Sequence, residues 1–398
     1  MKQYALITAS YWGFTLTDGA LRMLVVLYFH QLGYGPLAIA SLFLLYEFFG
    51  VVTNLVGGWL GARLGLGATL LLGLGLQILA LSMLLVDPVS LTVFWVMSAQ
   101  ALSGIAKDLT KMSAKSGVKT LVPDNQDQKL FRWVATLTGS KNALKGLGYF
   151  LGGVLLSGLG FRGAIGVLAG GLTLILLGAW LWLDHSAGQA SFKPKFKDLF
   201  SKSPAVNTLA AARLFLFGAR DVWFVVALPV YLQLEQQWSA LQVSTLLAVW
   251  VIGYGVVQAL APRLLGFGSS EVPGGRVAVV WGGILALTSA LVLTLVVLGA
   301  PTWLAVVGGL LLFGAVFAMN SSLHSFLIVR YAEADGVSLD VGFYYMANAM
   351  GRLLGTLLSG LVYQLAGFSA CLMVTLGAVL IATLISRRLP TATASAPG

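Results

Sequence analysis

The chain has 398 residues, of which 58% are hydrophobic and only 10% are charged, and its mean hydropathy is +0.89. A soluble globular domain carries about 25% charged residues, so this composition excludes an ordinary soluble protein and indicates a polytopic membrane protein. The net charge of +10 could suit an anionic partner, but in a membrane protein an excess of Lys and Arg first reports topology.

Apolar stretches long enough to cross a ~30 Å hydrocarbon core, which takes about 20 residues, recur along the whole chain. In the first half, six such spans are expected to start near Tyr4, Pro36, Ala68, Leu91, Phe131 and Gly163. In the second half, six more are expected to start near Ala205, Leu241, Val277, Thr302, Gly342 and Gly367. No cleavable signal pattern precedes the first span, so we expect the N-terminus to be retained. The sequence therefore predicts an all-α membrane protein with twelve transmembrane helices.

The longest polar interval, "DHSAGQASFKPKFKDLFSKSP" at residues 184–204, divides the chain into two sets of six spans. We interpret it as a cytoplasmic linker, since it is basic and rich in residues that break helices. The predicted domains are an N-terminal six-helix bundle at residues 1–183 and a C-terminal six-helix bundle at residues 205–390. A short tail at residues 391–398 follows.

Basic residues are distributed unevenly over the connecting segments. If the N-terminus is cytoplasmic, the outside loops collect only Arg162. The inside segments and helix ends collect Lys2, Arg63, Lys107, Lys111, Lys115, Lys119, Lys129, Arg132, Lys193, Lys195, Lys197, Lys202, Arg263, Arg276, Arg330, Arg387 and Arg388. We expect the protein to lie in the inner membrane of the cell. By the positive-inside rule, both of its termini are expected on the cytoplasmic side.

The two halves repeat one another. The stretch "KGLGYFLGGVLLSGLGF" that starts at Lys145 resembles "RLLGTLLSGLVYQLAGF" that starts at Arg352. Duplicated halves are how many secondary transporters build alternating access to a central site, so the repeat favours two pseudo-symmetric bundles. The offsets pair Lys145 with Arg352, Gly148 with Gly355, Gly160 with Gly367, Asp18 with Asp221, and Arg63 with Arg263.

Charged residues inside the spans are costly in a membrane and are therefore functional candidates. The cations are Arg22, Lys141, Lys145, Arg213, Arg220 and Arg352. The acids are Asp18, Glu47 and Asp221. Six cations against three acids leave three cations that need water or an anion. This excess predicts a water-filled cavity for an anionic substrate, because the Arg fork suits phosphate, arsenate or carboxylate and Lys adds a point charge.

The candidate site residues follow from this count. The predicted substrate-binding residues are the cations Arg22, Lys141, Lys145, Arg220, Arg352, Lys107 and Lys111, together with the polar Asn320, His324 and Asn348. Asp18, Glu47 and Asp221 are candidates for proton coupling, because burial and nearby charge can move a carboxylate pKa. The alternative is a structural ion pair, such as one between Asp18 and Arg22 at positions i and i+4, and the role of Arg213 stays open.

Four lysines follow one another at intervals of four in "SGIAKDLTKMSAKSGVK". Such steps drift slowly round a helix and produce a slanting stripe. We expect Lys107 and Lys111 to lie at the inner mouth of the cavity, where they would concentrate cytoplasmic anions. We expect Lys115 and Lys119 to form a solvated helix end that reports topology.

Other kinds of site find little support. Cys371 is the only cysteine, and the three histidines, His30, His185 and His324, lack metal-ligand spacing. No nucleophile signature such as GxSxG appears. We therefore expect no metal, no cofactor, no nucleic-acid partner and no enzymatic activity.

The loop "GGWLGARLG" between the second and third spans resembles the cytoplasmic signature of the major facilitator superfamily. Gly58, Arg63 and Gly65 match that signature, whereas Ala62 stands where the superfamily has Asp. The fifth span's "GYFLGG" is similar to the antiporter signature, with Tyr149 where Pro is usual. The resemblance implies the superfamily fold of two six-helix bundles, and it favours exchange.

Three longer stretches resemble the ArsJ-type organoarsenical efflux permeases of the same superfamily. They are "YWGFTLTDGALRMLVVLYFHQLGY", "LYEFFGVVTNLVGGWLGARLGL" and "SGIAKDLTKMSAKSGVKTL". This resemblance implies export of 1-arseno-3-phosphoglycerate, made by a glyceraldehyde-3-phosphate dehydrogenase that uses arsenate. The expected phenotype is arsenate resistance, with transport coupled to protons.

The charge count alone leaves other functions open. A permease for another organophosphate or organic anion would have the same basic cavity but give no arsenate phenotype. A membrane-embedded enzyme or lipid-handling protein would need a nucleophile or metal constellation that the sequence does not offer. An anion channel is a further alternative, but the duplicated halves favour rocking around a central site.

Overall fold

The computed structural model describes residues 2–64, 66–119, 127–183, 203–264, 274–331 and 337–390, and within these ranges every regular element is a helix. The helices of the first half are α1 (Lys2–Gln31), α2 (Pro36–Ser41), α3 (Leu44–Leu64), α4 (Leu66–Met83), η1 (Pro88–Ser90), α5 (Val93–Lys119) and α6 (Asp127–Trp182). Those of the second half are α7 (Pro204–Phe224), α8 (Ala227–Leu234), α9 (Ala240–Leu264), α10 (Gly275–Val297), η3 (Trp303–Gly308), α11 (Gly309–Tyr331) and α12 (Val337–Ser386).

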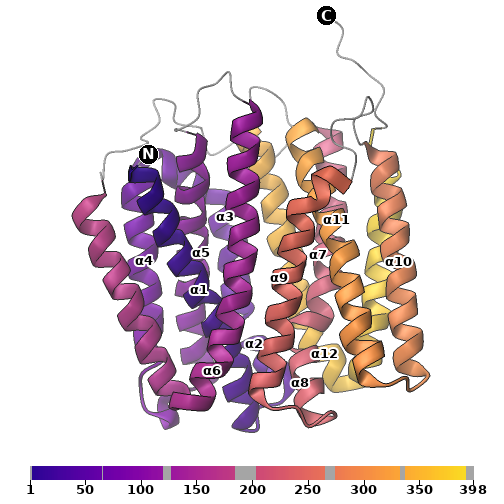
Figure 1. Cartoon of the computed structure of the whole chain (residues 1–398), viewed down its shortest axis with the longest axis horizontal. Coiled ribbons are helices and arrows are strands. Elements are labelled where there is room, and N and C mark those ends of the chain that lie inside the picture. The colour runs from indigo at the N-terminus through magenta and orange to yellow at the C-terminus, as the bar shows by residue number, and fades with distance from the viewer. Residues whose placement is uncertain are drawn as a thin grey trace, which may run out of the picture.

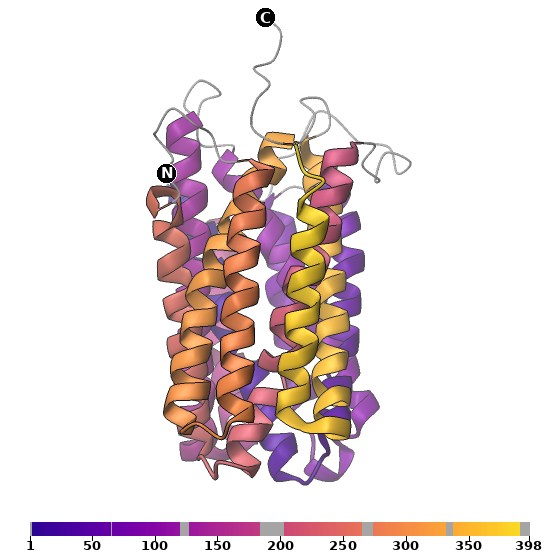
Figure 2. The ribbon, with the colours of Figure 1, turned by 90° about the vertical axis from the view of Figure 1, so that its right-hand side faces the viewer.

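The long helices run side by side from one end of the molecule to the other, and the two halves of the chain lie next to each other (Figure 1). A view turned by 90° shows the same near-parallel arrangement, with α12 beside α10 (Figure 2). The Gln3 side-chain amide donates to the Trp182 carbonyl at 3.0 Å. The start of α1 and the end of α6 therefore lie at the same end of the bundle.

Seven helical segments are long and apolar enough to cross a membrane, fewer than the twelve spans predicted. Two of the seven, Gly139–Trp182 and Gly342–Ser386, have 44 and 45 residues. At 1.5 Å per residue each would extend about 66 Å as a straight helix, twice the ~30 Å hydrocarbon core. Both segments instead reverse at a glycine.

The two reversals occur at Gly160 in α6 and at Gly367 in α12, the pair that the sequence repeat aligns. Their backbone angles are nearly the same, with φ 67° and ψ −179° at Gly160 and φ 76° and ψ −173° at Gly367. Only glycine adopts this region readily, because a Cβ would clash with the backbone. The predicted span starts at Gly163 and Gly367 therefore mark real turns between helices.

The repeat also explains how α6 and α12 pack. α6 lies along α1, and α12 lies along α7. A Cβ on Gly148 would lie 3.1 Å from the Cα of Gly19, and a Cβ on Gly355 would lie 2.7 Å from the carbonyl oxygen of Gly218. Small residues at these crossings let the backbones approach closely, as is common between membrane helices.

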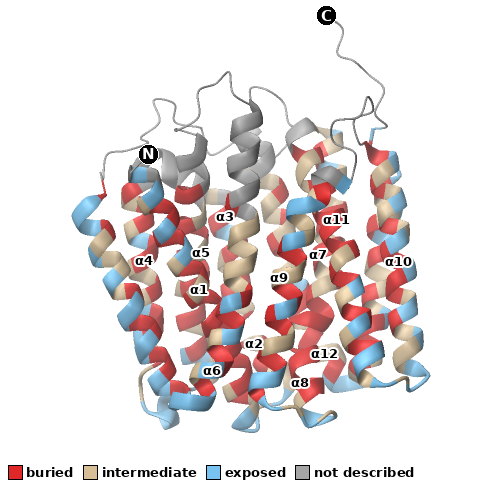
Figure 3. Cartoon of the chain, viewed as in Figure 1, coloured by how far each residue is buried: buried red, intermediate tan, exposed pale blue. Residues whose placement is uncertain are grey.

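The outer surface of the bundle is apolar. Large side chains such as Leu174, Leu287 and Leu365 are at least 72% exposed, and exposed residues lie on the outward faces of the helices while buried residues lie between them (Figure 3). In water such a surface would be unfavourable, but against lipid chains it costs nothing. Charged side chains within the membrane-spanning helices, such as Arg22, Glu47 and Asp221, are instead buried inside the bundle.

Candidate functional site

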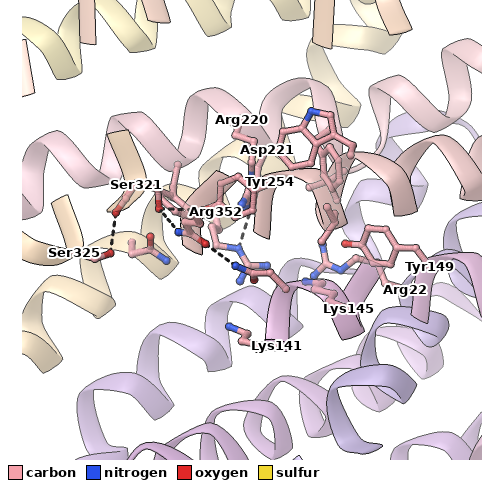
Figure 4. A pocket seen from close by; sticks show the side chains of 18 of the residues that line it. Arg22, Lys141, Lys145, Tyr149, Arg220, Asp221, Tyr254, Ser321, Ser325 and Arg352 are labelled. Atoms are coloured by element: carbon pink, nitrogen blue, oxygen red, sulfur yellow. Dashed lines mark hydrogen bonds and ion pairs between the residues drawn. The ribbon is translucent and has the colours of Figure 1, made fainter. Parts of the chain in front are cut away.

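A central cavity lies between the two halves, and its volume is about 160 Å³. This is comparable to the ~150 Å³ cavity that holds a benzene molecule in an engineered protein, so the space suits a small metabolite. Its side chains come from α1 and α6 of the first half and from α7, α9, α11 and α12 of the second (Figure 4). The lining residues with polar side chains are Arg22, Lys141, Asn142, Lys145, Tyr149, Arg213, Arg220, Asp221, Tyr254, Gln258, Ser321, Ser325, Tyr345, Asn348 and Arg352.

Five of the seven cations that the sequence predicts as substrate-binding residues line this one cavity, together with the predicted Asn348. The cations come from four helices, which places positive charge on both sides of the cavity. The structure thus brings together residues that are up to 330 positions apart in sequence, such as Arg22 and Arg352. That they bind substrate stays a prediction.

Two carboxylates join three of the arginines into a continuous chain of ion pairs. Glu47 Oε1 accepts from Arg22 Nη2 at 2.9 Å and from Arg352 Nη2 at 2.5 Å. Asp221 Oδ2 lies 3.3 Å from Arg352 Nε, and its Oδ1 lies 2.5 Å from Arg220 Nη2. Arg22 and Glu47 belong to the first half and the other three residues to the second, so the chain links the two halves beside the cavity.

Lys145 differs from these three arginines because it has no carboxylate partner among the described residues. Its Nζ lies 5.8 Å from the centre of the Tyr149 ring, and within the described part of the chain it makes no hydrogen bond or ion pair of its own. The side chain comes from α6 and lines the cavity, and the close crossing of Gly19 and Gly148 lies next to it along the same helix. An ammonium group in this position has room for an anionic ligand.

Arg213 is the sixth cation of the cavity and the one whose role the sequence leaves open. It is only 4% exposed. Its Nε donates to Asn348 Oδ1 at 2.9 Å and its Nη1 donates to the Ser321 carbonyl at 3.1 Å. The guanidinium also lies over the Phe217 ring at 3.9 Å. Arg213 is therefore held in place by neutral groups, and no carboxylate among the described residues pairs with it.

Neutral polar groups and aromatic rings complete the second-half wall. Gln258 Nε2 donates to the Tyr254 hydroxyl at 3.0 Å, and the Tyr254 hydroxyl donates to Ser321 Oγ at 2.9 Å. The Tyr254 ring stacks on Trp250 with the centres 5.6 Å apart. Gln258 Oε1 also accepts from Asn142 across the boundary between the halves at 2.7 Å. None of these uncharged residues was expected from the sequence, because nothing in a single apolar span marks which face lines a cavity.

The alternative pair of Asp18 with Arg22 does not form. Arg22 turns to Glu47, and Asp18 Oδ1 instead accepts from the Tyr46 hydroxyl at 2.8 Å. Asp18 is 6% exposed and, among the described residues, takes part in no ion pair. Tyr46 and Glu47 are neighbours on α3, and their side chains reach across to α1, where each meets one of these two polar groups.

Lys107 and Lys111 do not line the cavity, contrary to the expectation that they lie at its mouth. Lys111 Nζ forms a close ion pair with Asp108 and donates to Asn54 Oδ1 at 2.6 Å. Lys107 Nζ lies 4.1 Å from the centre of the Tyr46 ring. Asp108 is fully buried, pairs with both ammonium groups and so draws them toward α3. The side chains of Lys115 and Lys119 lie outside those described.

Asn320 and His324 also lie away from the cavity lining. The Asn320 amide donates to the carbonyls of Trp281 and Val316 at 2.9 and 3.0 Å. His324 is 2% exposed, in the interior of the bundle. The cavity face of α11 is instead formed by Ser321 and Ser325, which lie one residue further along and hence about 100° round the helix. Among the described residues, no three His, Cys, Asp or Glu side chains gather in a way that could hold a metal ion.

Comparisons with known proteins agree on the fold. The family model of the Major Facilitator Superfamily matches residues 7–323. A solved structure of a POT family transporter in complex with a thioalcohol-conjugated peptide is similar with a TM-score of 0.75 and 17% identity, over 96% of this chain and 94% of that one. A second solved structure, of a POT family transporter in complex with 5-aminolevulinic acid, is similar with a TM-score of 0.74 and 16% identity, over 96% of this chain and 94% of that one. No curated protein matches the chain.

Proposed function

Because the chain belongs to the Major Facilitator Superfamily, we propose that this membrane transporter carries a small organic anion through its central cavity by alternating access. The observation that carries the proposal is the charge of the cavity. Six cations line the cavity, whereas Asp221 is the one acid that lines it among the described residues. Glu47 does not line the cavity, but it contacts the lining residues Arg22 and Arg352. The cations that exceed these acids are most stable when a ligand supplies negative charge.

The same geometry disfavours a zwitterion such as a peptide or an amino acid. The two similar structures contain a peptide conjugate and 5-aminolevulinic acid, both of which carry an amino group. An ammonium group would need a free carboxylate in the cavity. Both oxygens of Asp221 already contact Arg220 and Arg352, and Glu47 is fully buried against two arginines. A purely anionic substrate therefore fits these contacts better.

For the substrate itself we propose 1-arseno-3-phosphoglycerate, exported in exchange for protons. The resemblance to organoarsenical efflux permeases supports the arsenic, and the arginines support a phosphate-like group, since guanidinium donates two parallel hydrogen bonds to such an oxyanion. A glyceraldehyde-3-phosphate dehydrogenase would supply the substrate in the cell. A permease for another small organophosphate or organic anion is the alternative, because the cavity charge alone does not specify arsenic.

The proposed topology has twelve crossings of the inner membrane with both termini in the cytoplasm. Seven segments are apolar enough by themselves, and two of these reverse at Gly160 and Gly367, which makes nine. The remaining three are α1, α4 and α5. α4 is short, and α1 and α5 carry buried charged residues that lower their hydropathy. We propose residues 1–183 and 205–390 as the two rocking bundles, joined by a cytoplasmic linker at residues 184–204.

The proposal is tested by arsenate resistance in a sensitive bacterial host. The chain is expressed alone, with a glyceraldehyde-3-phosphate dehydrogenase, and as the variant Lys145→Gln with that enzyme. We expect protection only when the native chain and the enzyme are present together. Arg276→Gln, which removes an exposed cation, is the control and should protect as well as the native chain.

Two outcomes distinguish an error in the proposed substrate from an error in the proposed transport function. If the native chain gives no protection but takes up organophosphates in vesicles, the arsenical is wrong and the anion carrier stands. If purified protein in vesicles moves no anion at all, the proposed function is wrong.

A further inference from the structure

We propose that the substrate is an anion with a charged group at each end, one bound by Lys145 in the first half and the other by Arg213 in the second. This inference rests on the proposed function and adds to it a second anion subsite at Arg213. Anions with a single charged end, and oxyanions with only one carbon, would then be poor substrates because they cannot reach both positions.

Arg213 has the features of an empty anion subsite. It is more than nine-tenths buried and lines the cavity. A guanidinium has five N–H donors, and two of them are used by Asn348 and the Ser321 carbonyl. Within the described ranges the other three meet no acceptor, and no carboxylate lies within ion-pair distance. A buried cation with unused donors beside a cavity gains most from an oxyanion ligand.

Arg213 is also aimed before any ligand arrives. Its two hydrogen bonds fix the plane of the guanidinium, and the Phe217 ring lies 3.9 Å below it while Tyr344 lies 5.2 Å away. Less side-chain freedom is then lost when an anion binds, which raises affinity. Such a fixed fork is suited to a phosphate, arsenate or carboxylate group.

Lys145 is a second cavity cation that has no carboxylate partner among the described side chains, and the Tyr149 ring lies nearby. The other three arginines of the cavity, Arg22, Arg220 and Arg352, share two carboxylates, so their charge is largely matched. The strongest demand for negative charge therefore lies at two separate places.

The two places are at opposite ends of the cavity. Lys145 lies with Arg22 and Tyr149 at one end, whereas Ser321, to which Arg213 donates, lies at the other end (Figure 4). Along α7, Arg213 is seven residues from Arg220, which corresponds to about 10 Å. A compact molecule with three carbons between two oxyanions, reached by the long Arg and Lys side chains, would connect the two ends.

A two-ended anion would also join the two halves of the transporter. Lys145 belongs to α6 and Arg213 to α7, so only a ligand that carries both charged groups contacts both bundles at these positions. A ligand drives a conformational change only by the difference in its contacts between the two states. Discrimination against single-ended anions would follow directly from this geometry.

The test is equilibrium binding to the full-length purified protein, with 1,3-propanediol bisphosphate and propyl phosphate as probes. The two share a carbon chain and differ in the second phosphate. We expect the bisphosphate to bind at least tenfold more tightly than propyl phosphate. Arg213→Gln should weaken the bisphosphate at least tenfold and change propyl phosphate less than twofold. Lys145→Gln should weaken both probes.

Two further variants control for folding and for net charge. Arg276→Gln removes one exposed positive charge and should leave the ratio of the two affinities unchanged. Asn348→Ala keeps the Arg213 charge but removes the group that aims it, so it should weaken only the bisphosphate, by a smaller factor. This variant keeps the test possible if Arg213→Gln does not fold.

The inference is overturned if the native protein binds both probes equally well, or if Arg213→Gln weakens both by the same factor. Either result would leave the anion carrier intact, since the single-ended probe would still bind. If neither probe binds and transport of anions is absent as well, the proposed function itself has failed.

Discussion

Glu47 holds together cations from both halves of the protein, and its replacement gives the sharpest prediction for stability. Glu47 is fully buried, and one oxygen accepts from Arg22 at 2.9 Å and from Arg352 at 2.5 Å. Glu47→Gln keeps an acceptor of similar shape but removes the charge. Breaking a buried ion pair by removing one partner costs about 3–5 kcal/mol, and we expect the lower end, about 3 kcal/mol, because the amide oxygen remains.

The assay is thermal unfolding of the purified protein in detergent, with and without 1,3-propanediol bisphosphate. Without ligand, Glu47→Gln should unfold at a lower temperature than the native chain. With ligand, the variant should gain more stability than the native chain, because the anion replaces the missing negative charge beside the two arginines and binds more tightly. Asp87→Asn is the matched control, since the ion pair of Asp87 with Arg162 is exposed and contributes about 0–1 kcal/mol.

Two results would refute this reasoning. If Glu47→Gln is as stable as the native chain, Glu47 does not hold the two halves together in the way that the contacts indicate. If the variant is destabilised but gains no more from the ligand than the native chain, the arginines beside Glu47 do not bind the anion.

Three further predictions concern transport and folding. Lys145→Gln should reduce anion uptake into vesicles at least tenfold with normal membrane insertion, because it removes a cavity cation that has no acidic partner in the described structure; near-normal uptake would exclude that role. If the transporter exchanges its anion for protons through Asp18, Asp18→Asn should keep anion binding but flatten the pH dependence of uptake, since Asp18 is a buried carboxylate that takes part in no ion pair among the described residues; an unchanged pH profile would move proton coupling elsewhere. Gly367→Ala should cost about 1–3 kcal/mol of unfolding free energy because of its positive φ. Gly377→Ala, at an open helical position, should be neutral or stabilising by up to about 1 kcal/mol; equal effects of the two substitutions would contradict the strain argument.

The overall architecture could be derived from the sequence because membrane burial leaves strong signals. Helix starts predicted near Pro36, Ala205 and Leu241 lie within one residue of those in the structure. The internal repeat aligned Gly160 with Gly367, the two glycines at which the chain reverses. Both positions are occupied by the same residue type because φ is positive at each. The excess of cations in the spans predicted a basic cavity, and five of the seven cations expected there line it, whereas Lys107 and Lys111 do not.

The details of the site could not be derived in the same way. Which acid pairs with Arg22 depends on the side chains that reach it from α3, and a separation of four residues along one helix wrongly suggested Asp18. The lysines of α5 were misplaced because their position depends on Asp108, which a stripe drawn on the helix surface left out. On α11 a rotation of one residue decides whether Ser321 or Asn320 faces the cavity.

The central claim is that the cations around the cavity bind the transported anion. The most direct measurement is an experimental structure of the full-length protein with 1,3-propanediol bisphosphate at saturating concentration. The account predicts one ligand inside the central cavity, with one phosphate against Lys145 and the other against Arg213. Ligand density elsewhere on the protein, or a cavity that stays free of anion at saturation, would contradict it.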